Sequence, residues 1–394
     1  MSNKYSSVFA VISSHGIMHS YLVILPALLP LVKVDLGNIE TVGLLASLVF
    51  LFYGWGSLPA GVLADKYPRR FLITASMGLC GFSSILVGLS WNLLTAALGF
   101  ILLGVGASLY HPPGYTLISL ISTEMKRGRY MGLQGLGGEI GMASAYFTSP
   151  ILGVLLGWRI TFMLWGILGM LMAIIDFIMI EEDEPACKDV DFRSRSGISR
   201  RGMLPDESVK FLVVVFIIVI CSGALWNGVS SFILTYINEA KRIQLIIAGG
   251  LSTISYTVGA LAQVIGGELS DKYGRRIFLQ AGFLSFAIFL FLLTVIPSSI
   301  LLVLFIVSML GFTFYITQSP LNALLGDVSP RGTVGVAYGF NFVIKFGIGG
   351  VSPAIAGFLA RSYSMNHIFY FFALIAAVAF ISSLAVKNTG DKHA

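Results

Sequence analysis

Twelve long apolar runs, separated by short polar segments, occupy almost the whole chain and restrict its fold more than any other feature. Each run is long enough to cross a bilayer as a helix, which takes about 20 residues. The chain is 56% hydrophobic and only 11% charged, too apolar for a soluble protein of 394 residues. The alternation typical of a membrane β-barrel is absent, so the sequence predicts an all-α membrane protein with twelve transmembrane helices. We expect these helices at residues 7–32, 41–63, 71–90, 93–121, 130–154, 160–180, 211–236, 244–269, 277–296, 300–326, 333–359 and 364–386.

One polar segment differs from the short loops. Residues 181–210 are long, charged and without apolar periodicity. We interpret them as a cytosolic linker between two bundles of six helices each. The predicted organisation is therefore an N-terminal six-helix bundle at 1–180, the linker at 181–210 and a C-terminal six-helix bundle at 211–394.

The basic residues are distributed unequally between the two sides of the membrane. With the N-terminus in the cytosol, 19 of the 25 lysines and arginines fall in cytosolic segments and five in outer loops. This bias predicts a protein of the inner or plasma membrane with both termini cytoplasmic. The net charge of +6 then serves to anchor the chain, and we expect no nucleic-acid partner.

A ten-residue pattern occurs after the second apolar run and again after the eighth. It reads GVLADKYPRR at 61–70 and GELSDKYGRR at 267–276. Because shorter matches follow in the same order, the two halves of the chain are predicted to be duplicated units. These shorter matches are Arg127-Gly128 with Arg331-Gly332, and Ser149-Pro150 with Ser352-Pro353.

The repeated pattern predicts a charged latch at the cytosolic mouth of the molecule. In such a latch, Asp65 or Asp271 would pair with an arginine of its own turn and with a neighbouring helix N-terminus. The alternative is a simple cytosolic anchor. The predicted gating residues are Gly61, Asp65, Arg69, Arg70, Gly267, Asp271, Gly274, Arg275 and Arg276.

With these motifs the chain resembles the major facilitator superfamily over essentially its whole length. The G-x-L-x-D-x-x-G-R-R signature is complete at 267–276, whereas Pro68 replaces its second glycine in the first copy. The LPALLP of 25–30 and the YHPPG of 110–114 are similar to the fosmidomycin-resistance-like branch, although His19 stands where that branch commonly carries an acid. The resemblance implies a secondary transporter in which two six-helix bundles rock around a site near the membrane midplane.

Several polar side chains fall within the apolar runs, where they are costly and commonly functional. His15 and His19 are four residues apart and share one helix face. His111 and Glu139 fall at a similar depth, and two prolines interrupt the helix directly after His111. If the first, fourth, seventh and tenth spans line a cavity, as the resemblance implies, these groups converge in one polar chamber. The predicted substrate and proton site consists of His15, His19, Tyr110, His111, Glu139, Trp226, Asn227, Gln318 and Lys345.

The ionisable members of this site fit more than one role. His15, His19 and His111 could pack on helix contacts, bind protons or an anionic substrate, or ligate a transition metal. Glu139 could donate an interhelical hydrogen bond from a protonated carboxyl, or carry protons across the membrane. Lys345 could pair with Glu139 inside the bundle, or anchor an anionic substrate.

Together these features predict a monomeric, proton-coupled transporter of small organic anions or zwitterions, with efflux by antiport preferred through the branch resemblance. Proton-coupled uptake and transport of a divalent metal are the alternatives, and a non-transporting membrane sensor is a remote one. We expect no enzyme and no cofactor, since no nucleophile–base pair, phosphate loop or HExxH spacing occurs. The expected partners are a small-molecule substrate, protons and the lipid bilayer. Asp176 lies one turn from the cytosolic end of its run and can snorkel to the membrane surface, so no mechanistic role is predicted for it.

Overall fold

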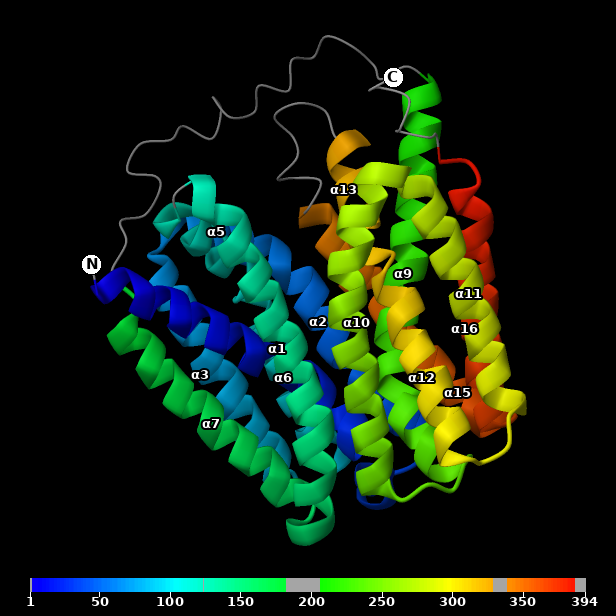
Figure 1. Cartoon of the computed structure of the whole chain (residues 1–394). Coiled ribbons are helices and arrows are strands. Elements are labelled where there is room, and N and C mark those ends of the chain that lie inside the picture. The colour runs from blue at the N-terminus through cyan, green and yellow to red at the C-terminus, as the bar shows by residue number, and fades with distance from the viewer. Residues whose placement is uncertain (1, 123, 182–205, 329–338, 387–394) are drawn as a thin grey trace.

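The computed structural model describes residues 2–122, 124–181, 206–328 and 339–386, and the regular elements in these ranges are all helices (Figure 1). Twelve helical spans there are long and apolar enough to cross a membrane, and they overlap the twelve apolar runs. The predicted fold class is therefore confirmed. Most of the predicted linker and the Arg331-Gly332 match lie outside the described residues.

The spans fall into two sets of helices. The first six spans comprise α1 (Ser2–Leu36), α2 (Ile39–Lys66), α3 (Arg69–Gly88), α4 (Leu93–Ser108), α5 (His111–Ile121), α6 (Glu124–Leu156) and α7 (Trp158–Met179). The last six comprise α9 (Asp206–Glu239), α10 (Leu245–Tyr273), α11 (Arg275–Val295), α12 (Ile300–Tyr315), α13 (Gln318–Val328), the π-helical turn η1 (Val343–Ile348), the 3₁₀ turn η2 (Gly349–Val351), α15 (Ser352–Ser362) and α16 (Met365–Ser383). We call α1–α7 the first bundle and α9–α16 the second bundle.

Two spans are interrupted at corresponding places. The fourth span changes from α4 to α5 after Ser108, and the tenth changes from α12 to α13 after Tyr315. The second helix begins at His111 in one case and at Gln318 in the other, and prolines follow in both. Proline lacks the N–H that continues a helix, which explains the breaks. The fourth and tenth spans are equivalent in a chain duplicated after six spans, so the matching breaks support a duplication.

Close helix packing brings the polar residues of the first bundle together. α1 packs along α6, and α3 packs along α7. A Cβ atom at Gly141 of α6 would lie 1.9 Å from the carbonyl oxygen of Gly16 on α1, so this approach requires glycine. The contact places the histidines of α1 beside the segment of α6 that carries Glu139.

The two bundles meet on one side of the molecule. The start of α1 and the end of α16 lie on the other side, which we call the termini side, and the bundles diverge toward it in Figure 1. On the opposite side, Lys33 of α1 pairs with Glu239 of α9 at 2.6 Å, and Arg361 of α15 pairs with Glu40 of α2 at 2.6 Å. The Ala354 amide also donates to the Ser47 hydroxyl at 2.9 Å. These contacts close the space between the bundles on the opposite side.

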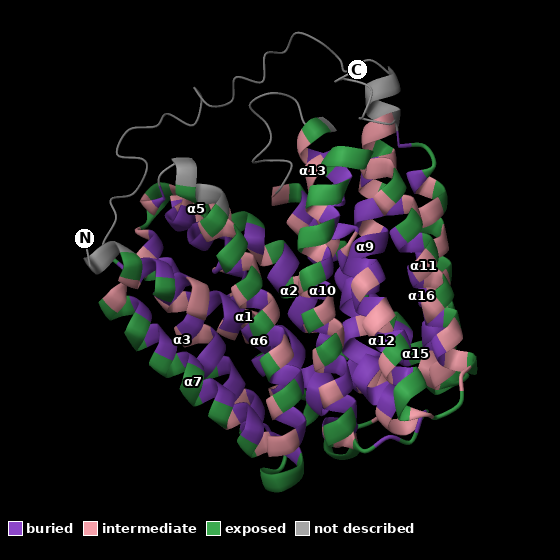
Figure 2. Cartoon of the chain, viewed as in Figure 1, coloured by how far each residue is buried: buried purple, intermediate pink, exposed green. Residues whose placement is uncertain are grey.

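The outer surface of the bundles is apolar, as expected of helices that face lipid. Large hydrophobic side chains such as Ile178 and Phe305 are exposed there, whereas the buried residues face the helix contacts (Figure 2). A soluble protein rarely exposes continuous apolar patches of this extent. The distribution agrees with the length and composition of the twelve spans in placing the molecule within a membrane.

The structure contradicts the expectation for Asp176. Its side chain is fully buried, and the Ser14 hydroxyl of α1 lies 2.7 Å from each carboxylate oxygen. The prediction that Asp176 can snorkel to the surface was wrong because its partner lies on another helix, 162 residues away in the sequence. Position along the span alone did not indicate that contact.

Candidate functional site

A cavity of about 170 Å³ lies between the two bundles. The expected first, fourth, seventh and tenth spans contribute to its wall, and the second, fifth, eighth and eleventh spans contribute as well. The structure thus brings most of the predicted site residues to one chamber. Those that line it are His15, His19, His111, Glu139, Trp226, Gln318 and Lys345.

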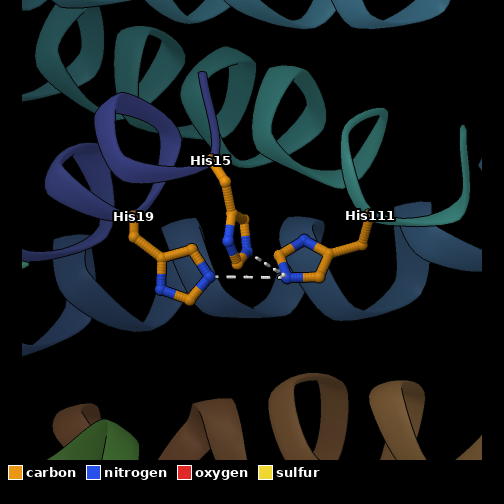
Figure 3. Close-up of side chains that lie close together, drawn as sticks. All are labelled: His15, His19 and His111. Atoms are coloured by element: carbon orange, nitrogen blue, oxygen red, sulfur yellow. Dashed lines mark hydrogen bonds between the residues drawn. The ribbon is translucent and has the colours of Figure 1, made fainter. Parts of the chain in front are cut away.

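Three histidines form one wall of the cavity, and their rings converge (Figure 3). The Nε2 atom of His111 lies 3.3 Å from Nε2 of His15 and 3.4 Å from Nε2 of His19. His15 and His111 are buried, whereas His19 is half-buried. The helical spacing of His15 and His19 and the start of α5 at His111 produce this convergence, and the group is suited to hold a metal ion.

Other residues of the first bundle fix the orientation of two of these rings. Nδ1 of His15 donates to the Gln134 carbonyl at 2.5 Å, and the Tyr53 hydroxyl lies 3.2 Å from Nδ1 of His111. The Tyr110 ring stacks on His15 with a centroid distance of 5.4 Å, and its hydroxyl donates to a backbone carbonyl of α1. Tyr110 therefore supports the wall from behind and is not one of the residues that line the cavity.

Lys345 lies across the cavity on the π-helical turn of the eleventh span. Such turns are rare and are frequently found at functional sites. The Lys345 ammonium donates to Oε1 of Gln318 at 2.8 Å. The amide of Asn227 donates to the Lys345 carbonyl at 2.9 Å, so Asn227 supports this turn and is absent from the cavity wall. The amide oxygen of Gln318 carries no charge, and the Glu139 carboxylate acts on the Lys345 ammonium from beyond ion-pair distance.

Glu139 of α6 is the one carboxylate among the described residues that line the cavity. Its side chain is half-buried, and Oε2 has no hydrogen-bond partner. No ion pair joins it to Lys345 within the described part of the chain. Glu139 also borders a second, apolar cavity of about 410 Å³ between α6 and α10. A carboxylate with an unsatisfied oxygen at this place is available to exchange a proton or to contact a ligand.

Several aromatic and polar residues of the cavity wall were not predicted from the sequence. They lie on the second, fourth, tenth and eleventh spans, and aromatic side chains there are indistinguishable by composition from those that face lipid. Only their depth, close to that of the histidines, could have indicated a role. These residues include Tyr53, Tyr115, Tyr315, Asn322, Asn341, Phe342 and Phe346.

The repeated motifs lie on the termini side, at the turns after the second and eighth spans. Gly274 has a φ of 91°, a conformation that favours glycine, whereas Pro68 has a φ of −55° and gives the first copy a different turn. Arg275 pairs with Asp327 at the end of the tenth span. Among residues whose side chains the structure describes, neither Asp65 nor Asp271 forms an ion pair, and the charged latch stays a prediction.

A match to a known protein family shows the class of protein to which this chain belongs. Residues 9–352, and separately residues 215–393, match the model described as Major Facilitator Superfamily. The chain belongs to the major facilitator superfamily. It is accordingly a secondary transporter of small solutes and not an enzyme.

Relatives of this transporter are distant from it. An uncharacterised MFS-type transporter of Methanocaldococcus jannaschii is 24% identical over 361 residues, covering 89% of this chain and 90% of that protein. The hexuronate transporter of Bacillus subtilis is 23% identical over 400 residues, covering 92% and 91%. The fosmidomycin resistance protein of Escherichia coli is 22% identical over 330 residues, covering 83% and 79%. The fosmidomycin resistance protein is thus one of several distant relatives, and the identities do not single out its branch.

A solved structure has the same fold as this transporter. A bacterial homologue of the human lysosomal transporter Spinster, in an inward-facing and unoccupied conformation, matches it with a TM-score of 0.78. The two share 16% sequence identity, and the match covers 97% of both chains. The likeness supports the twelve-helix architecture, whereas the site of each protein has its own residues.

Proposed function

We propose that this protein is a proton-coupled transporter of small organic anions or zwitterions. The observation that carries the proposal is a cavity between the two bundles that has Lys345 on one wall and Glu139 on another, with no ion pair between them. An ammonium bonded only to neutral groups attracts an anion, and a carboxylate without a fixed cation can take up and release a proton. The hexuronate transporter among the relatives is compatible with an acidic organic substrate.

Alternating access is the mechanism that we propose for this movement. The bundles, as two rigid units, would rock about the cavity and open it to one side at a time. The ion pairs on the opposite side would hold that side closed, and the latch around Asp65 and Asp271 would close the termini side in the other state. The absence of an ion pair at Asp65 and Asp271 among the described side chains, beside diverging helices, is compatible with a structure that is open toward the termini side.

Packing at Gly43 provides a test of this mechanism. A Cβ atom at Gly43 of α2 would lie 2.5 Å from the Pro353 carbonyl oxygen of the second bundle. We expect Gly43→Val to weaken closure on the opposite side by about 1–3 kcal/mol, the usual cost of overpacking, and to shift the population toward an opening there. Spin-label distances between Val34 and Tyr363, exposed residues of different bundles on that side, would measure the shift.

The matched control for this substitution is Gly250→Val. Gly250 lies near the same end of the membrane, and nothing lies within 4 Å of the position of its added Cβ atom. Both variants place valine in a helix at the same cost in helix propensity, so only the contact between bundles differs. Equal distance distributions in the two variants would contradict the proposed closure.

Transport in proteoliposomes tests the proposed function directly. A thermal-shift screen of organic acids, betaines, sugar acids and phosphonates would first identify solutes that bind, since binding to the folded state raises the melting temperature. We expect an outward gradient of a solute that binds to change the internal pH of the vesicles. Solute movement without any change of pH would rule out proton coupling.

The proposal also includes the orientation of the protein in the membrane and the direction in which it moves its solute. The Lys and Arg bias of the sequence favours cytoplasmic termini, and we propose this orientation in an inner or plasma membrane. We also propose that a single chain is the functional unit and that it exports its solute by antiport. A membrane-impermeant thiol reagent should label Cys187, in the polar segment between the halves, only from the cytosolic side. A divalent metal as cargo is less well supported, because its three candidate ligands, His15, His19 and His111, all lie on the first bundle and would keep the ion as the bundles rock.

A further inference from the structure

We propose that His15, His19 and His111 form a binding site for a divalent transition metal of the zinc class, with one coordination position open toward the cavity. The proposal of a metal site depends only on the positions of the three histidines. The use of its open position, to take the anionic group of the transported solute, rests on the proposed function.

The spacing of the three imidazoles suits a metal ion. Four-coordinate zinc binds imidazole nitrogens at about 2.0–2.1 Å, which places neighbouring ligand nitrogens about 3.3–3.4 Å apart in a tetrahedron. The two Nε2–Nε2 distances from His111 are 3.3 and 3.4 Å. A ligand nitrogen of each of the three histidines lies within 4.8 Å of those of the other two, so a small rotation of one ring completes the triangle.

A hydrogen bond favours the tautomer of His15 that binds a metal. Nδ1–H of His15 donates to the Gln134 carbonyl, which leaves the lone pair on Nε2, the atom that faces the other histidines. The Tyr53 hydroxyl lies 3.2 Å from Nδ1 of His111 and 3.5 Å from its Nε2, so it contacts this ring without fixing its tautomer. Metal-binding histidines almost always have a partner such as the Gln134 carbonyl on the second ring nitrogen.

Without a metal, the same cluster cannot satisfy all of its ring nitrogens. When the hydrogen of His111 is on Nε2, it can bridge to His15 or to His19 but not to both, and when it is on Nδ1, the Nε2 lone pairs of His15 and His111 face each other. Nδ1 of His19 is also buried without a partner. A dication accepts the Nε2 lone pairs of all three histidines and removes the conflict between the facing Nε2 atoms.

All three ligands belong to the first bundle, on α1 and α5. Rocking of one bundle against the other therefore leaves the site intact, so the ion stays with the protein through a transport cycle. Its open position faces the same cavity as Lys345. A carboxylate or phosphonate between the metal and the ammonium would be held from both sides, which narrows the proposed substrate class to solutes with such a group.

Cobalt binding tests the site, because four-coordinate Co²⁺ absorbs visible light far more strongly than hydrated Co²⁺. Full-length, tag-free protein in detergent would be stripped with a chelator, titrated with Co²⁺ and then competed with Zn²⁺. We expect one Co²⁺ per chain with the strong four-coordinate spectrum. His19→Ala and His111→Ala should each weaken binding by more than about 100-fold, because each removes one of three ligands.

The control is His367→Ala, since His367 is exposed on the second bundle and bonds only locally to Ser364. It should bind Co²⁺ like the wild type, and thermal unfolding in chelator would show whether each variant is folded.

Cobalt affinity that is unaffected by His19→Ala in a folded protein would overturn the site. Solute-driven proton movement in the presence of chelator, by a protein that binds no cobalt, would overturn the metal site and leave the proposed function standing. Tight cobalt binding by a protein that moves no protons would support the site and contradict the proposed function.

Discussion

Replacing Glu139 with glutamine is expected to abolish solute-driven proton movement while leaving solute binding unchanged. Glutamine has nearly the same shape as a protonated glutamate but cannot release a proton. Since Glu139 is the one carboxylate among the described residues that line the cavity, its loss removes the group that we propose to carry the proton. The pH change in proteoliposomes should fall to that of protein-free vesicles, whereas exchange of labelled solute at equal concentrations on both sides should continue.

Asp176→Asn is the matched control for this experiment. Asp176 is also a buried acid of the first bundle, but it accepts hydrogen bonds from Ser14 and is absent from the cavity wall. Its neutralisation should leave the coupling of solute to protons intact, although it weakens a contact between α1 and α7. Proton movement that survives Glu139→Gln, or that is lost equally in both variants, would remove Glu139 from the mechanism.

The fold could be predicted from the sequence because each span carries its own signal. An apolar run of about 20 residues reports a membrane helix without any knowledge of its neighbours. The breaks in the fourth and tenth spans were partly visible for the same reason, since the prolines after His111 act on their own helix. Features that depend on a single helix could thus be predicted from the sequence.

The rest of the site depends on how the helices rotate, and the sequence does not contain that information locally. Tyr110 and Asn227 lie at the right depth, yet they support the wall from behind. Tyr53 and Phe346 line the cavity, yet nothing in their runs distinguishes them from residues that face lipid. Likewise, Lys345 was expected to pair with Glu139 or to stay free for an anion, and only the contact with Gln318 favours the second role.

Lys345 is also the residue whose loss should weaken solute binding most. A hydrogen bond to a charged group contributes about 1.5–3 kcal/mol, so Lys345→Met is expected to lower the affinity for an anionic solute by about 10- to 150-fold. Lys345→Arg keeps the positive charge and should retain more of the affinity. Calorimetric titration of the detergent-purified variants with a solute from the thermal-shift screen would measure both.

Lys241, a buried lysine outside the cavity, provides the control for Lys345→Met. It shows whether solute affinity depends on the positive charge in the cavity or on any positive charge of the second bundle. Lys241 lies between α9 and α10, donates to the Ile296 carbonyl at 2.6 Å and is outside the cavity, and burial lowers the pKa of its ammonium. Lys241→Met removes the same charge from the same bundle and should leave solute affinity unchanged. If the two methionine variants bind the solute equally well, the ammonium of Lys345 does not hold the substrate. The anionic substrate class would then lose its main support, because Lys345 is the one lysine or arginine among the described residues that line the cavity.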